Sequence, residues 1–287
     1  MLIKQTVIPV LMARLSQYHK NILPLMLQTL ILFSILTLIT PEAQSNVFDP
    51  TWSFANISLN YLDWSKGTEQ RTKNNAAKGD FFYLELEGGV GYNWGEFYGF
   101  ADLENPTYNT HESDGRNHRR TAVKVTSHIY LGESPFSVYL HIYDFRDYGY
   151  DAYEQDQVLG FGFRHNFSNG IWFKPFLGVA HVESNAYSGM NGYMLGWVAG
   201  YDFKVFDENF SITNWHELTF DRDKEYLSDN YVNGNAGEMG NNGALSLWWH
   251  PIEKITTGIQ YRYSINKLGT PDAYQNAVIY TLRFNFW

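Results

Sequence analysis

Apolar and polar residues alternate in about twelve separate runs of this chain, and this alternation constrains the fold more than any other feature. Segments 81–87, 136–143 and 278–286 are clear examples. A period of two is typical of a β-strand whose two faces meet different surroundings. Each run has roughly the 9–11 residues that a tilted strand needs to cross a bilayer. The sequence therefore predicts membrane-spanning strands with one apolar and one polar face.

The connections between the predicted strands alternate between long polar loops and tight turns. The strands are expected to begin near residues 52, 81, 94, 121, 136, 157, 171, 193, 209, 244, 255 and 276. The long loops are expected at residues 64–80, 104–120, 144–156, 183–192, 221–243 and 265–275. Long loops on one side and short turns on the other are typical of outer-membrane barrels. We therefore expect an all-β fold, a transmembrane antiparallel up-and-down β-barrel of about twelve strands, with both termini on the periplasmic side.

A soluble β-sandwich is the alternative for an alternating all-β sequence. Sandwich strands are usually shorter, and sandwich loops are not sorted by length. The tryptophans favour the barrel because they stand at predicted turn-side strand ends, where an interfacial aromatic girdle lies. These tryptophans are Trp52, Trp94, Trp172, Trp248, Trp249 and Trp287.

The composition excludes several classes of function. The chain has 287 residues, a formal net charge of −9 and no Cys. A negative chain lacks the basic stripe that binding to nucleic acid requires. The absence of Cys excludes disulfides and thiolate metal sites, and we expect no metal and no cofactor.

The N-terminal segment has the composition of a secretory signal peptide. Three basic residues precede an apolar run at residues 22–39, and Ala43 and Ser45 occupy the −3 and −1 positions of a cleavage site. This order of basic, apolar and small residues is typical of exported proteins. We therefore expect residues 1–45 to be removed and residues 46–287 to form the outer-membrane barrel. An uncleaved anchor helix is the alternative.

Charged residues gather on the polar face of the predicted strands. A barrel of about twelve strands is wider than one of eight, whose lumen side chains can fill. An Arg or Lys on the lipid face would cost roughly 2–4 kcal/mol near the bilayer midplane. We therefore assign to the lumen Glu85, Glu87, Tyr98, Phe100, Asp102, Lys124, His128, Tyr139, His141, Arg164, Lys174, Asp202, Lys204, Gln260, Arg262 and Arg283.

One predicted hairpin resembles a known family. The stretch YLELEGGVGYNWGEFYGFAD, residues 83–102, is similar to the nucleoside-specific outer-membrane channels of the Tsx type. Those channels have a YLExE strand followed, across a short turn, by a W-x-[DE]-FYGYAD strand. Phe100 stands where that pattern has Tyr. The related OmpK-like proteins belong to the same broad family. The resemblance implies an outer-membrane channel for facilitated diffusion of small solutes, in the first place nucleosides, and not an enzyme.

The polar face of this hairpin is the expected solute site. Tyr98 and Phe100 can stack on a nucleobase, which contributes roughly 1–3 kcal/mol per contact. Glu85 and Glu87 can accept hydrogen bonds from the ribose hydroxyls, and Asp102 lies beside them. Weak sites in series favour entry without trapping. The alternative for each residue is a lumenal salt-bridge network that keeps the wall rigid.

Other functions stay open at this stage. Some barrels of this size are phospholipases with a His–Ser pair on the lipid-facing wall, but His128 and His141 are expected in the lumen. His181 alternates with lipid-facing residues and has no evident nucleophile beside it. Loop 221–242 is long, acidic and rich in Gly and Asn, as a docking surface for phage would be. A barrel that serves mainly as a surface or phage receptor, or an unspecific porin, is the alternative function.

The expected partners follow from the predicted location in the outer membrane. They are nucleosides or other small polar solutes, outer-membrane lipid and lipopolysaccharide, and the barrel-assembly machinery. That machinery reads a last strand that alternates and ends in an aromatic residue, as segment 278–286 does. Phage contact through the extracellular loops is a further expectation.

Overall fold

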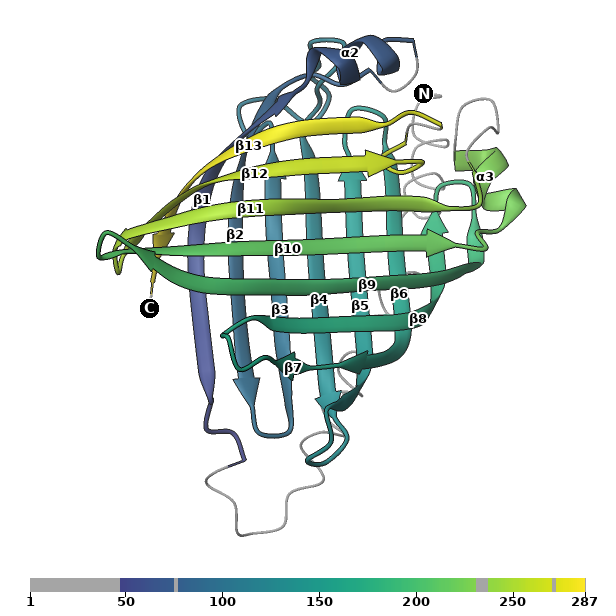
Figure 1. Ribbon diagram of the computed structural model, residues 1–287. Coiled ribbons are helices and arrows are strands. Elements are labelled where there is room, and N and C mark those ends of the chain that lie inside the picture. Colours follow the sequence, from purple (N-terminus) through teal and green to yellow (C-terminus); the bar gives the residue numbers. More distant parts are fainter. Residues whose placement is uncertain (1–46, 75–76, 231–236, 270–271, 287) are drawn as a thin grey trace, which may run out of the picture. The chain divides into compact units, whose positions relative to one another are not determined.

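Twelve long antiparallel strands close into a barrel in the computed structural model (Figure 1). The structure describes residues 47–74, 77–230, 237–269 and 272–286. The chain divides into two units, residues 1–49 and 50–287, and the second unit contains every described strand. The expected signal peptide, residues 1–45, lies outside the described residues. The predicted fold class is confirmed.

The strands follow the order of the chain around the barrel. They are β1 (Trp52–Trp64), β2 (Phe81–Tyr92), β3 (Gly95–Glu104), β4 (Arg120–Tyr130), β5 (Phe136–Asp147), β6 (Ala152–Phe163), the two-residue β7 (His165–Asn166), β8 (Trp172–Ser184), β9 (Ser188–Val205), β10 (Glu208–Phe220), β11 (Gly240–Ile252), β12 (Ile255–Ile265) and β13 (Gln275–Asn285). The seam between β1 and β13 runs in continuous register from Asn56 opposite Asn285 to Trp64 opposite Ala277. Pairing of β6 with β8 completes the wall.

Side chains alternate between the lumen and the outer wall. On β2, the side chains of Phe82, Leu84 and Leu86 are 53%, 39% and 54% exposed. Glu85 and Glu87, which alternate with them, are half-buried. A row of large apolar side chains on the outside of a barrel would be unfavourable in water. The same row is favourable in contact with lipid. The outward face is therefore the membrane-facing surface of an outer-membrane barrel.

The long loops and the tight turns lie at opposite ends of the barrel (Figure 1). The loops contain two short helices, α2 (Lys66–Thr72) and α3 (Lys224–Asn230), which the sequence analysis did not predict. Among the described residues, none of the helices has the length and apolar character to cross a membrane. α2 is fixed to the barrel rim because the Thr68 hydroxyl donates to the backbone oxygen of Asn276 at 3.1 Å.

Two of the expected long loops are much shorter than predicted. β6 already begins at Ala152 and β9 at Ser188, so these loops cover only residues 148–151 and 185–187. The start of β6 is polar because its lumenal side chains bind groups from other loops. Glu154 accepts a 2.9 Å hydrogen bond from the Tyr226 hydroxyl, and Asp156 lies 3.9 Å from Lys267 Nζ.

The turn-side tryptophans do not form a common lipid-facing girdle. Trp249 faces outward and is 41% exposed. Three others point toward lumenal cations: Trp52 and Trp172 toward Lys174, and Trp248 toward Arg283. Their expected place at the strand ends is confirmed, but alternation along a strand puts neighbouring positions on opposite faces. The girdle prediction is therefore wrong for these three, and Trp287 lies outside the described residues.

Candidate functional site in the lumen

The five residues expected to form the solute site share the inner wall of the β2–β3 hairpin. In the hairpin register Glu85 lies opposite Asp102 and Glu87 lies opposite Phe100, with Tyr98 two positions closer to the turn. All five are partly buried. The structure therefore places these two aromatic rings and three carboxylates as neighbours on one lumenal surface.

A hydrogen-bond network holds Tyr98 and Glu87. The Tyr98 hydroxyl donates to Glu87 Oε1 at 2.7 Å. The other carboxylate oxygen, Oε2, accepts from Asn56 Nδ2 at 3.1 Å and lies 2.9 Å from Arg283 Nη2. Both oxygens of Glu87 are thus engaged by protein groups. We infer that Glu87 positions the Tyr98 ring more than it offers a free acceptor to a solute.

Glu85 and Asp102 have fewer donors. Glu85 Oε1 accepts from the Ser58 hydroxyl at 3.2 Å and lies 3.9 Å from Arg283 Nη2. Asp102 Oδ1 is buried, and within the described residues it accepts no hydrogen bond. A buried acceptor without a donor costs about 1–3 kcal/mol, so the Asp102 carboxyl group is less well satisfied than that of Glu87. These two carboxylates are the better candidates for binding a polyhydroxylated solute.

Ion pairs cross the lumen from facing walls. Lys124 of β4 pairs with Glu217 of β10, and Lys174 Nζ of β8 lies 2.7 Å from both carboxylate oxygens of Glu96 of β3. The two lysines were assigned to the lumen from sequence, but their partners were not identified. Each pair joins strands that are not neighbours in the sheet. The pairs therefore narrow the interior as well as neutralising charge.

A tryptophan that the sequence analysis missed lies beside two lumenal cations. The Trp215 ring centroid is 4.5 Å from the Arg262 guanidinium carbon and 5.5 Å from Lys124 Nζ. Trp215 lies between Asn214 and His216 in a strand without a simple apolar alternation. Counting in twos from the acidic Glu217 would have placed it on the polar face.

The serine–histidine contacts of the lumen do not have the arrangement of a nucleophile and its base. Ser211 Oγ donates to Asp202 Oδ1 at 2.6 Å and lies 2.8 Å from His250 Nε2. Because the hydroxyl proton points to Asp202, the His250 nitrogen must be the donor, whereas catalysis needs it to accept that proton. Ser137, which contacts His128 at 2.9 Å, is only 2% exposed and therefore cannot meet a substrate.

Within the described residues, three histidines face the outer wall, where one was expected from the sequence. His181 alternates with outward residues of β8 as expected. His165 is exposed and lies between the Phe163 and Phe167 rings. His216 Nδ1 lies 2.9 Å from the Tyr263 hydroxyl, and its ring stacks on Trp197 at 4.5 Å. Tyr263 and Trp197 thus satisfy the polar His216 ring on an apolar wall, and neither of them is a serine nucleophile.

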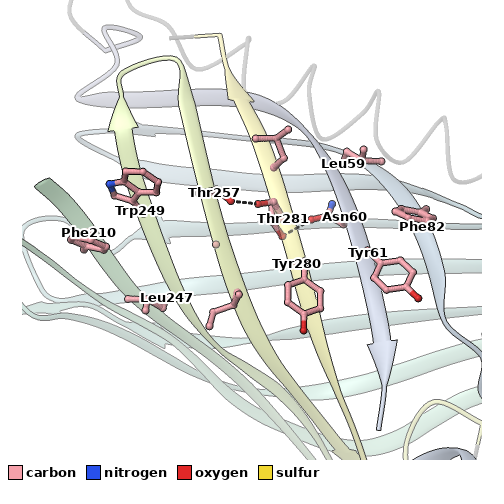
Figure 2. Close-up of a pocket in the computed structure, with 13 residues that line it drawn as sticks. Leu59, Asn60, Tyr61, Phe82, Phe210, Leu247, Trp249, Thr257, Tyr280 and Thr281 are labelled. Atoms are coloured by element: carbon pink, nitrogen blue, oxygen red, sulfur yellow. Dashed lines mark hydrogen bonds between the residues drawn. The ribbon is translucent and has the colours of Figure 1, made fainter. Parts of the chain in front are cut away.

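A groove of about 470 Å³ lies on the outer wall over β1 and β11–β13 (Figure 2). Lipid-facing side chains such as Leu59, Leu247 and Leu282 line most of it. Thr257 in the groove donates its hydroxyl to the Thr281 carbonyl at 2.8 Å, so this polar group is satisfied without water. The groove therefore has the lining of a lipid-covered surface and is separate from the lumen.

Known proteins resemble this chain at two levels. A family model described as "nucleoside-specific channel-forming protein, Tsx" matches residues 59–286, nearly the whole barrel. Among solved structures, the NanC porin is 13% identical, with 79% of this chain and 98% of that chain covered and a TM-score of 0.46. LpxR from Salmonella typhimurium is 9% identical, with 80% and 99% covered and a TM-score of 0.40. The outer-membrane channel DcaP of Acinetobacter baumannii is 11% identical, with 82% and 96% covered and a TM-score of 0.34.

Proposed function

Since this chain belongs to the Tsx family of nucleoside-specific channel-forming proteins, we propose that it carries nucleosides through its lumen by facilitated diffusion. It is a channel-forming barrel of the bacterial outer membrane. The observation that carries the nucleoside part of the proposal is the inner wall of the β2–β3 hairpin. There two aromatic rings, Tyr98 and Phe100, stand beside the carboxylates of Glu85 and Asp102.

The chemistry of a nucleoside matches this wall. Its flat base can stack on Phe100 and on the Tyr98 ring that Glu87 holds in place. Its ribose hydroxyls are donors for Glu85 and Asp102. Stacking contributes roughly 1–3 kcal/mol per contact, and an affinity near 4 kcal/mol corresponds to a Kd of about 1 mM. An affinity of this order lets the solute enter and leave quickly, as a channel requires.

The lumen-crossing ion pairs support a selective channel over an unspecific porin. Lys124–Glu217 and Lys174–Glu96 span the interior between facing walls, which leaves solutes in contact with side chains on their way through. An unspecific porin instead depends on a wide aqueous path. The surface-receptor function has no comparable observation in its favour among the described residues.

Block of ion current by nucleosides tests the proposal. The purified protein in a planar bilayer should show current block by adenosine and uridine at millimolar concentration, with weaker block by glucose and glycine. Replacing both Tyr98 and Phe100 with Ala should raise the half-blocking concentration roughly five- to a hundredfold without closing the pore. Replacing the lipid-facing Leu84 and Leu86 with Val is the matched control and should change nothing.

Two outcomes would contradict it. If the wild type shows no nucleoside block, nucleosides are not the solute. If the double variant of Tyr98 and Phe100 keeps wild-type block, the stacking site lies elsewhere in the lumen.

A further inference from the structure

Three cations meet at the loop-side mouth of the lumen. Lys78 lies in the loop that precedes β2, Arg120 is the first residue of β4, and Arg262 lies on β12. Burial lowers the pKa of Lys78 to about 8, and the nearby charges of Arg120 and Arg262 lower it further than Glu104 raises it back. The geometry agrees. The Trp64 ring beside Lys78 and the Phe81 ring beside Arg120 belong to one packed cluster, and Ala277 of that cluster lies opposite Arg262 in the sheet.

Only one of the three cations has a carboxylate at ion-pair distance. Arg120 pairs with Glu104. Lys78 Nζ donates to the Leu268 carbonyl at 2.7 Å, and Arg262 Nη1 donates to the Gly243 carbonyl at 3.3 Å. Within the part of the chain that the structure describes, neither has a carboxylate oxygen within 4.0 Å. A carbonyl supplies a dipole and not a charge, so Lys78 and Arg262 have no direct ion-pair partner there. Glu217, which pairs with Lys124, acts on Arg262 only from farther away.

The lumenal cations that brace the wall each have a carboxylate partner. Lys124 pairs with Glu217, Lys174 with Glu96, and Arg283 with Glu87. In each case a wall-bracing cation has its own carboxylate, which offsets the cost of removing it from water. Lys78 and Arg262 lack that partner, so no ion pair offsets the cost of removing their charges from water.

The three cations are not fully covered by the groups around them. The residues paired with Arg262 on the adjoining strands are Ala244 and Ala277, which have small side chains. Lys78, Arg120 and Arg262 all keep part of their surface accessible. None of the three side chains is therefore sealed from solvent.

Flat rings lie against the same cations. Lys78 Nζ is 5.8 Å from the Trp64 ring centroid, and the Arg120 guanidinium carbon is 4.7 Å from that of Phe81. Together with Trp215 beside Arg262, these rings give the site apolar walls. Apolar walls lower the local dielectric constant and strengthen the attraction of the cations for an anion.

We propose that Lys78, Arg120 and Arg262 form an oxyanion-binding site at the loop-side mouth of the channel. Its ligand is a phosphate or sulfate group, either free or carried on a small solute. The guanidinium of Arg262 offers two parallel N–H donors to such a group, and Lys78 adds a point charge. The site adjoins the loop-side end of the solute wall, where Arg120 pairs with Glu104 of β3, and the proposal stands whether or not nucleosides are the solute.

Sulfate block of single-channel current is the direct test. Inorganic sulfate added on the loop side should block wild-type current, and Arg262→Gln combined with Lys78→Gln should raise the half-blocking concentration tenfold or more. The matched control is Lys66→Gln combined with Lys73→Gln, which removes the same charge from exposed positions at the start of α2 and just after its end. It should leave the block within about twofold of the wild type. Equal block in the wild type and the Arg262/Lys78 variant would overturn the proposal, as would absence of sulfate block.

Arg262→Lys distinguishes a binding site from a damaged barrel. It should keep the wild-type ion selectivity of the current, measured as reversal potential in a KCl gradient, because the charge is unchanged, while weakening sulfate block because the paired donors are lost. If it keeps full sulfate block, the guanidinium geometry plays no part and the proposal fails. Comparison of adenosine with adenosine monophosphate identifies the source of the group. Tighter block by the monophosphate, lost in the Arg262/Lys78 variant, means a phosphate carried on a solute, and equal block means a free oxyanion.

Discussion

The Tyr98 hydroxyl donates a 2.7 Å hydrogen bond to Glu87 Oε1, which ties the aromatic and acidic residues of the β2–β3 hairpin into one unit. Tyr98→Phe keeps the ring and removes only this bond. Because a hydrogen bond contributes about 0.5–1.5 kcal/mol net, we expect nucleoside block to weaken roughly two- to tenfold, less than in Tyr98→Ala. Titration of the current with adenosine measures both. If Tyr98→Phe loses as much as Tyr98→Ala, the hydroxyl itself contacts the solute.

The ion pair between Lys124 and Glu217 predicts a change in selectivity and stability. Glu217→Gln leaves Lys124 without its carboxylate, so the current should shift toward anions in a KCl gradient. The same variant should lower the free energy of unfolding in urea by at most about 3–5 kcal/mol, because an unpaired charge stays in a mostly buried place. Glu133→Gln, in an exposed tight turn, is the control. Unchanged selectivity in Glu217→Gln would show that this pair does not face the conduction path.

Lys78 predicts a pH dependence of the oxyanion site. Its pKa of about 8, against an ordinary 10.5, means that it is charged below pH 8 and neutral above it in the folded protein. The charged groups that face it are Arg120, Glu104 and Arg262. Sulfate block should therefore weaken as the pH rises from 7 to 9, with a midpoint near 8. Sulfate is a suitable probe because its own charge is constant in this range.

The same shift has a definite sign for stability. Between pH 8 and 10.5 the unfolded chain holds a proton on Lys78 that the folded chain has released, so this group adds stability as the pH rises through that window. Lys78→Arg stays charged throughout and should abolish both the step in sulfate block and this rise in stability. A step that persists in Lys78→Arg must come from another group.

Alternation along the chain predicted the strands because each strand meets lipid on one face, and this surrounding is the same for every strand. Alternation did not predict a strand where only the polar face determines its position. The beginning of β6 reads as loop until Glu154 and Asp156 meet Tyr226 and Lys267, which come from distant loops.

In the candidate site, local contacts could be predicted from the sequence and contacts between distant residues could not. The β2–β3 hairpin is a local unit, so its five residues could be grouped from sequence. The partner of Lys124 could not, because Glu217 is 93 residues away and reaches it only once the barrel has closed. The anion site has the same origin, since Lys78, Arg120 and Arg262 come from three separate connections and strands.

Export gives a prediction for the segment outside the described residues. We propose that residues 1–45 are cleaved after Ser45, on the basis of the basic, apolar and small-residue order. Mass spectrometry of protein from the outer-membrane fraction should then find a chain that begins at Asn46. A purified chain that still contains Leu25 and Met26 would show an uncleaved anchor instead. Ser45→Pro, which blocks a small-residue site, should leave the longer precursor.

The last prediction concerns the end of the chain and the seam of the barrel. The Phe286 amide donates to the Ala55 carbonyl at 2.8 Å, one residue beyond β13, so Phe286 extends the β1–β13 seam. Its carbonyl also accepts from Lys254 Nζ at 2.8 Å. Phe284 and Phe286 lie on the outer wall, 45% and 38% exposed, in register with the other lipid-facing residues of the strand.

Removal of Phe286 and Trp287 together should therefore block assembly, since it deletes a seam hydrogen bond and the terminal aromatic residue that we expect the barrel-assembly machinery to read. Removal of Trp287 alone should be tolerated, because the alternating register ends at Phe286. Heat-modifiable migration on gels, measured on outer-membrane fractions, reports the folded protein in each case. Equal loss in both truncations would mean that Trp287 carries the signal, and equal folding in both would mean that neither aromatic residue is needed to close the barrel.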